Sequence, residues 1–315
     1  MPIDIAVVMD PIGSIKIAKD TTFAMLLEAQ RRGHRLHYVR PGSLHWAQGE
    51  PKATLAALNV EDNAEHWYRL GDAEIRSLRE VDLVLMRSDP PVDSQYLHDT
   101  QILSRAADLG VQVVNDPRGL RDMNEKLFAL HFPELCPATL VSRSADQVRA
   151  FVSEHGDCVL KPLDGMGGRS IFRARHDDGN LNVIIETLSQ GGRELIMAQR
   201  YLPEIKDGDK RVLLVDGEPV PFCLARIPSG RDFRGNLAAG GRGEARPISD
   251  ADRRIAAAVG PELKRRGMVF VGLDVIGDRL TEINVTSPTC VREIDAQCGT
   301  NIAGDLFDCL EARFG

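Results

Sequence analysis

The stretch VFVGLDVIGDRLTEINV at residues 269–285 constrains the fold more than any other part of the chain. Two apolar, β-branched runs flank the turn formers Gly277-Asp278, so the segment predicts a β-hairpin. Glu282 and Asn284 are two residues apart and therefore share one face of their strand. A three-residue loop, Gly277-Asp278-Arg279, would place Asp274 directly across from Glu282, on that same face.

Two carboxylates and an amide oxygen on one face of a hairpin suit a hard cation such as Mg²⁺, which keeps waters and is shared with phosphates. The competing interpretation is a hairpin whose polar face meets water. A Glu-x-Asn pattern taken alone favours that second interpretation. The rest of the chain has to decide between them.

Composition and charge exclude several classes of protein. A chain of 315 residues is long enough for two domains of an ordinary globular protein. Its net charge of −7 argues against a general nucleic-acid or membrane-surface binder. There is no apolar run of transmembrane length and no signal-peptide pattern at the N-terminus. The six cysteines lack C-x-x-C spacing, so we expect reduced thiols in a cytoplasmic protein, without zinc or disulfides.

Strand and helix patterns alternate over the first 120 or so residues, which predicts a parallel α/β sheet. Asp20 is expected to cap a helix that ends at Gly33. Residues 40–80 are poorly patterned and are interpreted as connecting structure. No G-x-G-x-x-G follows the first strand, so a nicotinamide-dependent dehydrogenase is disfavoured. The chain also lacks the H-E-x-x-H and G-x-S-x-G motifs of zinc and serine hydrolases.

Lysines and glycines stand out in the middle of the chain. A short helix at 124–130 carries Lys126, and Lys161 interrupts an apolar strand at 158–163. A lysine in such a strand is costly unless its ammonium group reaches water or an anion. The glycine-rich stretch 164–168 follows, where backbone N–H groups could approach phosphate oxygens. A glycine-rich hairpin turn is an equally good interpretation.

An antiparallel meander at 207–228 carries Arg211 and Arg226. Arginines on half-buried strands are usually surface charges, and the functional alternative is a pair of cations facing phosphate or carboxylate. Residues 228–246 form a long loop rich in glycine and arginine, which predicts an anion-binding lid rather than a disordered insert. Helices are expected at 249–266 and 302–313.

Taken together, the motifs resemble those of the ATP-grasp ligases, and within them the bacterial glutathione synthetase family. The resemblance covers nearly the whole chain and is thinnest between residues 40 and 80. The matching words are MDPI at 9–12, MLLEAQRRG at 25–33, LRDMNEKL at 120–127, LKPLDGMGG at 160–168, DGDKRVLLVDGEPVPFCLARIP at 207–228, RGNLAAGGRGE at 234–244 and GLDVIGDRLTEINVTSPTCVREI at 272–294.

The resemblance implies a role for each matched residue. The ATP-binding positions would be Lys126, Lys161, Gly165, Met166, Gly167, Gly168, Gln199, Arg200, Tyr201, Leu202 and Asp209. The metal ligands would be Asp274, Glu282 and Asn284. Positions acting on the transferred phosphoryl group, or in the lid above it, would be Arg211, Arg226, Gly240 and Gly241. Substrate would meet Arg292, Ser14 and Ser287. Arg169 and Arg200 depart from the residues that are common within these motifs.

The fold that the resemblance implies is an α/β chain with an N-terminal parallel, Rossmann-like substrate domain at 1–122. A two-lobed ATP-grasp domain with antiparallel sheets would follow. Its small lobe would span 123–199 and its large lobe 200–315, with the lid at 228–246 and the metal hairpin at 269–285.

The implied activity is ATP-dependent ligation of γ-glutamyl-cysteine and glycine through an acyl phosphate, with Mg²⁺, for which Mn²⁺ can substitute. A homo-oligomer, a tetramer in this family, is expected. Two alternatives stay open: another carboxylate–amine ligase of the same fold, and a non-catalytic ATP-binding module.

Overall fold

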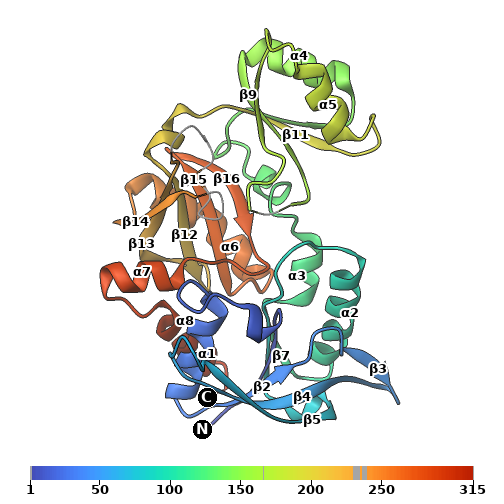
Figure 1. Cartoon of the computed structure of the whole chain (residues 1–315), viewed down its shortest axis with the longest axis vertical. Coiled ribbons are helices and arrows are strands. Elements are labelled where there is room, and N and C mark those ends of the chain that lie inside the picture. Colours follow the sequence, from blue (N-terminus) through green and yellow to red (C-terminus); the bar gives the residue numbers. More distant parts are fainter. Residues whose placement is uncertain (1, 166, 230–234, 236–239, 315) are drawn as a thin grey trace.

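The computed structural model describes residues 2–165, 167–229, 235 and 240–314, and within them three β-sheets. The sheets follow one another along the long axis of the molecule (Figure 1). The N-terminal sheet lies at one end, the small sheet with its two helices at the other, and the hairpin expected at 269–285 between them. Met166 and residues 230–234 and 236–239 of the expected lid lie outside the described residues.

The N-terminal sheet has a parallel centre, with β2 (Arg35–Val39), β1 (Asp4–Val8), β6 (Leu83–Met86) and β7 (Gln112–Val114) in that order. Successive side chains of β1 enter different cores, because side chains alternate across a strand. Ile5 and Val7 pack with α1 (Thr21–Arg31) and α8 (Ile302–Glu311), whereas Ala6 and Val8 pack with α2 (Ser94–Asp108). The Asp20 side chain caps α1, as predicted.

The interpretation of residues 40–80 as connecting structure was wrong. They form β3 (His45–Ala47) and a long antiparallel pair, β4 (Glu50–Val60) and β5 (Tyr68–Ser77), which extend the sheet beyond β2. Eight of the ten β5 residues are exposed, so this strand has no apolar alternation to reveal it. The 3₁₀ helix η2 (Leu78–Glu80) follows β5, and η1 (Ile12–Ser14) follows β1.

The small sheet has the order β10 (Phe172–Arg175), β9 (Asp157–Pro162), β11 (Ile196–Arg200), β8 (Thr139–Ser142). Its strands bury Cys158, Leu160 and Ala198 beneath α4 (Ala145–His155) and α5 (Leu181–Ser189). Lys161 is therefore on the opposite face of β9, away from the helices. Before this sheet come α3 (Pro117–Asp122) and η3 (Phe128–His131), and Lys126 lies between them rather than in the helix expected at 124–130.

The large sheet has the order β14 (Arg242–Pro247), β13 (Glu218–Ile227), β12 (Asp209–Val215), β15 (Phe270–Ile276), β16 (Arg279–Asn284). The 3₁₀ helix η4 (Pro203–Asp207) leads into it, and α6 (Asp250–Arg265) packs on one face. Two further elements, a strand and a helix, were not predicted. The last residues of the expected lid are β14, and α7 (Val291–Cys298) follows the hairpin.

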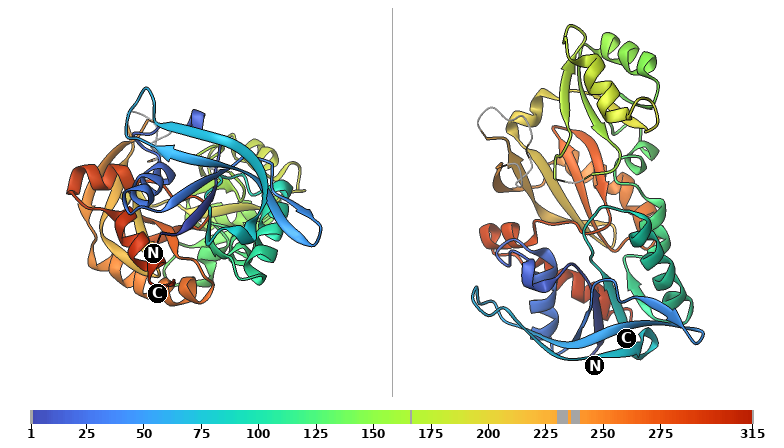
Figure 2. Two further views of the ribbon diagram at one scale, coloured as in Figure 1. Left: turned by 90° about the horizontal axis from the view of Figure 1, so that it is seen from below. Right: turned by 45° about the vertical axis from the view of Figure 1, so that its right-hand side comes forward.

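The two ends of the chain meet, because α8 packs against α1 (Figure 2). Arg32 joins the helices through Glu28 at 2.7 Å, Asp308 at 2.7 Å and Glu311 at 2.9 Å. No described helix has the length and apolar character needed to cross a membrane. All six cysteines are free thiols, as expected.

Replacing Glu28 by glutamine should lower the free energy of unfolding by about 2 kcal/mol near neutral pH, because the buried carboxylate accepts from both Arg31 and Arg32. Arg31, against the opposing effect of burial, and then Arg32 lower the pKa of Glu28 from 4.5 to about 2. This stabilisation is therefore complete above pH 4.5 and is lost as the pH falls towards about 2. Urea unfolding of both proteins at falling pH should show the difference shrink. Glu186→Gln, an exposed change on α5, is the control, and a pH-independent deficit in E28Q would contradict the assignment.

Candidate active site

A cavity of about 620 Å³ lies where the small sheet, the large sheet and the N-terminal sheet approach one another. Strands β9 and β11 contribute Val159, Lys161 and Gln199 from the helix-free face of the small sheet. The large sheet and its hairpin contribute Asp209, Arg211, Arg226, Asp274, Glu282 and Asn284. The N-terminal part contributes Lys16, Lys19, Asp20 and Asp89. Most of the residues predicted for ATP and metal thus line one cavity.

The pairing of Asp274 with Glu282 arises differently from the prediction. The loop has two residues, because Ile276 pairs with Arg279 and Val275 with Leu280. Regular pairing would next place Thr281 opposite Asp274. A bulge inserts Thr281 instead, so that Asp274 pairs with Glu282 and both line the cavity. The three-residue loop was wrong, and the shared face was correct for another reason.

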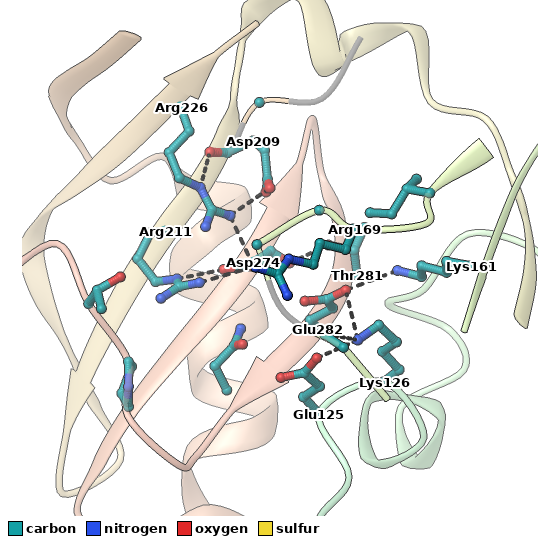
Figure 3. A pocket seen from close by; sticks show the side chains of 18 of the residues that line it. Glu125, Lys126, Lys161, Arg169, Asp209, Arg211, Arg226, Asp274, Thr281 and Glu282 are labelled. Carbon is teal, nitrogen blue, oxygen red and sulfur yellow. Dashed lines mark hydrogen bonds and ion pairs between the residues drawn. The ribbon is translucent and has the colours of Figure 1, made fainter. Parts of the chain in front are cut away.

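Asp274 is held by two arginines (Figure 3). Arg211 is opposite Asp274 in the register of β12 and β15, and it donates from Nε to Oδ1 at 2.6 Å and from NH2 to Oδ2 at 3.2 Å. Arg226 on β13 reaches Asp274 Oδ2 at 3.0 Å and Asp209 Oδ2 at 2.6 Å. Burial alone would raise the pKa of Asp274, but the two arginines outweigh it and hold that pKa well below its usual range.

The pKa of Asp209 is shifted in the opposite direction from the pKa of Asp274. Burial raises the pKa of Asp209 to about 6, and Arg226 opposes the shift only in part. Its Oδ1 is buried without a hydrogen-bond partner among the described residues. A ligand hydroxyl group entering the cavity could satisfy this oxygen, since an unpaired buried acceptor is costly.

Glu282 lies between two lysines (Figure 3). Its Oε1 is 3.1 Å from Lys161 Nζ and 3.8 Å from Lys126 Nζ. Burial would raise the pKa of Glu282, and the two lysines together lower it. Lys126 also pairs with Glu125 and donates to Gly165 O at 3.2 Å. The cavity therefore holds two ion-pair clusters, one of arginines around Asp274 and one of lysines around Glu282.

Lys126 is positioned by backbone contacts on both sides. The Asn124 side chain accepts from the N–H groups of Lys126 and Leu127, each at 3.0 Å. The carbonyl of Glu125 accepts from Ile283 N at 2.8 Å, which ties this segment to β16. The aliphatic stem of Lys126 is buried, at 4% exposure of the residue, so its ammonium group has little freedom to leave the cavity.

The donor set at the hairpin fits a hard divalent cation. Asp274 and Glu282 supply carboxylate oxygens, and Asn284 donates Nδ2 to Gly272 O at 3.3 Å, so its Oδ1 is the atom left to coordinate. No group of three His, Cys, Asp or Glu residues with metal-binding geometry occurs in the described part of the chain. The set therefore fits a metal that is shared with another oxygen ligand, such as a phosphate, rather than one held entirely by protein.

The glycine loop after β9 takes a conformation that favours glycine. Gly165, Gly167 and Gly168 have φ values of +130°, +70° and +75°, in the region that side chains with a Cβ rarely adopt. All three line the cavity beside Lys126 and Lys161. This supports a loop whose backbone can approach a ligand closely.

The apolar end of the cavity surrounds the expected hinge. Val159, Leu202, Ile205 and Ile276 line it, with Gln199, Arg200 and Tyr201 beside them. The Arg173 guanidinium stacks 3.7 Å from the centroid of the Tyr201 ring and is held by Asp157. An apolar lining with a fixed aromatic ring suits a flat heterocycle.

Among the described residues, four predicted positions do not line the cavity. Ser14 donates its hydroxyl to Pro11 O at 2.7 Å, while its neighbours Lys16 and Lys19 do line the cavity. Arg292 pairs through NH2 with Asp62 at 2.7 Å. Gly240, whose carbonyl accepts from Ser229 at 2.7 Å, and Gly241 lie beside undescribed residues of the expected lid. Ser287, by contrast, does line the cavity.

Several acidic residues that line the cavity were not predicted from the sequence as site residues. Glu125 precedes Lys126, and Glu293 follows the hairpin at the start of α7. Asp89 follows β6, and its N–H donates to Asp10, which follows the neighbouring parallel strand β1. Ligands tend to bind at the carboxyl ends of parallel strands, so the position of Asp89 was a usable signal. Glu125 and Glu293 gave no comparable signal.

Comparison with known proteins decides the family. The model of the prokaryotic glutathione synthetase N-terminal domain matches residues 3–121, and that of the prokaryotic glutathione synthetase ATP-grasp domain matches residues 125–299. The chain belongs to the prokaryotic glutathione synthetase family. Its residues 125–299 are thus an ATP-grasp domain, which implies ATP binding.

Relatives within this family match from end to end. Glutathione synthetase of Xanthomonas campestris pv. campestris is 67% identical over 99% of both chains, and that of Salmonella typhimurium is 57% identical over 99% of both. Among solved structures, D-cycloserine synthetase DcsG has a TM-score of 0.68 at 16% identity, covering 99% of this chain and 100% of that one. The ATP-grasp ligase PsnB, complexed with a phosphomimetic precursor variant, Mg and ADP, has a TM-score of 0.61 at 21% identity over the full length of both. These two likenesses show the fold.

Proposed function

We propose that this chain is an ATP-dependent carboxylate–amine ligase that joins γ-glutamyl-cysteine and glycine, giving glutathione, ADP and phosphate. The observation that carries the proposal is the convergence of Lys126, Lys161, Arg211 and Arg226 with the oxygen-bearing face of the hairpin on one cavity. Such a site neutralises phosphates and needs no protein nucleophile.

The nucleotide would lie along the small sheet. Its adenine would enter the apolar space at Gln199–Leu202, and Asp209 would accept from a ribose hydroxyl. Lys126, Lys161 and the glycine loop at 165–168 would hold the phosphates.

Asp274, Glu282 and Asn284 would hold Mg²⁺, or Mn²⁺ in its place. A bound cation there supplies positive charge to the phosphate oxygens and orients them. The ion pairs of Asp274 and Glu282 must then rearrange, which frees the arginines and lysines to face the phosphates.

In the reaction, a carboxylate oxygen of γ-glutamyl-cysteine attacks the γ-phosphorus of ATP, and ADP leaves. The amine of glycine then attacks the acyl carbon, phosphate leaves, and the amine gives up a proton. Arg211 and Arg226 would neutralise charge on the phosphoryl oxygens. Gly240 and Gly241 would belong to a lid that excludes water from the acyl phosphate.

The peptide would occupy the part of the cavity near the N-terminal sheet. It has two carboxylates and one ammonium group, and this part of the cavity offers Lys16 and Lys19 together with Asp20, Asp89 and Glu293. Ser287 lies on the same side, and Ser14 immediately precedes these lysines in the chain. This part of the cavity therefore offers cations for the two carboxylates of the peptide and carboxylates for its ammonium group.

A phosphate-release assay tests the proposal. It uses ATP, Mg²⁺, γ-glutamyl-cysteine and each of several amino acids. Rapid release with glycine and not with alanine supports glutathione formation. Preference for another amine indicates a different carboxylate–amine ligase, and nucleotide binding without any turnover indicates a non-catalytic ATP-binding module.

Arg292→Lys should raise KM for a carboxylate-bearing substrate roughly tenfold while leaving KM for ATP almost unchanged, because lysine cannot reproduce a bidentate guanidinium fork. In the structure, Arg292 pairs with the exposed Asp62, and its NH1 is buried without a described partner. A substrate carboxylate could therefore replace Asp62. Asp62→Asn is the matched control and should lower that same KM by removing the competitor. Equal effects of R292K on both substrates, or none, would contradict the assignment.

The same proposal covers the organisation of the chain. We place the substrate domain at 1–122, the small lobe at 123–199 and the large lobe at 200–315. We also propose a cytoplasmic homo-oligomer, a tetramer, whose mass light scattering would measure.

A further inference from the structure

Arg169 is a cation of the cavity to which neither the metal hairpin nor the ATP motifs assign a role. It follows Gly167-Gly168 in the glycine loop, is exposed, and lines the cavity. Its side chain extends from the loop over the middle of the cavity, where Asp274 and Glu282 lie (Figure 3). It makes no ion pair with any carboxylate in the described part of the chain, unlike Lys126, Lys161, Arg211 and Arg226.

The charges around it show why an additional cation matters. Each of the four buried cations is within ion-pair distance of a carboxylate of the same cavity. These carboxylates are Glu125, Glu282, Asp274 and Asp209. Four cations and four carboxylates leave this part of the cavity close to neutral. A triphosphate with one bound Mg²⁺ adds a net charge of about −2, which the buried groups do not offset.

We propose that Arg169 binds the terminal phosphate of the nucleotide, which rests on the proposed function. An arginine fork matches phosphate oxygens and forms charge-assisted hydrogen bonds with them. Because Arg169 is exposed and pairs with no carboxylate of the described residues, it can turn towards the phosphates without breaking any ion pair that the structure describes. The left-handed glycines beside it let the loop bring the guanidinium close to the ligand.

Calorimetry on the full-length protein tests this assignment with Mg²⁺·ATP, Mg²⁺·ADP and adenosine as probes. Arg169→Ala should weaken Mg²⁺·ATP roughly tenfold, as expected for one lost charge-assisted hydrogen bond, and leave adenosine unchanged. Arg169→Lys should restore most of the affinity, because a point charge also binds phosphate. The ATP deficit of R169A should shrink at high salt, since the site is exposed.

Arg175→Ala is the matched control. Arg175 is an exposed arginine of the same lobe that pairs with Asp177 at 3.5 Å and does not line the cavity, so its loss should change none of the affinities. Equal affinities of R169A and wild type for Mg²⁺·ATP would overturn the proposal, as would an equal loss for adenosine. Failure of the wild-type protein to bind Mg²⁺·ATP would instead overturn the proposed function.

Discussion

Replacing Asp274 by asparagine is expected to abolish ligase activity and to destabilise the fold. Asp274 is 5% exposed and is the carboxylate that both Arg211 and Arg226 contact. Asparagine leaves Arg211 without the carboxylate that accepts from it, and leaves Arg226 paired with Asp209 alone among its two described ion-pair partners. Breaking such a buried pair costs about 3 kcal/mol. Activity should fall by about 10³-fold, since a preorganised charged group of the metal hairpin is lost.

Phosphate release and urea unfolding measure the two effects of D274N separately. Asp278→Asn is the control, because it removes a carboxylate from the turn of the same hairpin. The Asp278 side chain is 63% exposed, and its ion pair, with Arg279 at 3.3 Å, lies at the surface. It should change the free energy of unfolding by less than about 0.5 kcal/mol and leave activity intact. Retention of activity in D274N would exclude Asp274 from the metal site.

Lys161→Met is expected to lower kcat/KM by about 100- to 1000-fold with little change in stability. Lys161 is 5% exposed, and its ammonium group lies 3.1 Å from Glu282 in the cavity. Methionine keeps the apolar stem within β9 and removes the charge. Glu282 keeps Lys126 as a partner, so no buried charge is left unpaired. Loss of the cation should therefore affect mainly the binding and transfer of phosphate.

The same assays, with Mg²⁺·ATP affinity added, test K161M. Lys206→Met, an exposed lysine of η4, is the matched control and should behave like the wild type. A large loss of stability in K161M would show that Lys161 supports the fold, and unchanged turnover would remove it from the phosphate site. D274N should lose more stability than K161M, because D274N removes the carboxylate that two buried guanidinium groups contact. K161M leaves Glu282 with Lys126 as a partner.

Helix-capping residues in the sequence predicted where some helices begin, because a cap acts on the residues next to it in the chain. The helix α1 begins after Asp20 and α6 begins after Ser249, because these side chains accept hydrogen bonds from the free N–H groups of the first helical turn. Apolar periodicity identified most strands that are buried on at least one face, but it missed β4, where Ala53, Leu55, Leu58 and Val60 are buried. It failed for β5, whose residues are mostly exposed, and for α7, whose first residue follows Cys290 at a φ of +92° without a side-chain cap.

By itself, the sequence determined which kinds of residue the hairpin 269–285 carries and that Glu282 and Asn284 share a face, because that follows from the period of a strand. Only the tertiary structure decided the rest. The bulge at Thr281 places Asp274 opposite Glu282. Regular pairing after a two-residue loop would have placed Asp274 opposite Thr281. The partners of Asp274 and Glu282 come from β12, β13, β9 and the segment before η3. Ion pairs between residues more than 40 positions apart depend on how strands pair and how sheets pack, and no local pattern in the chain encodes either.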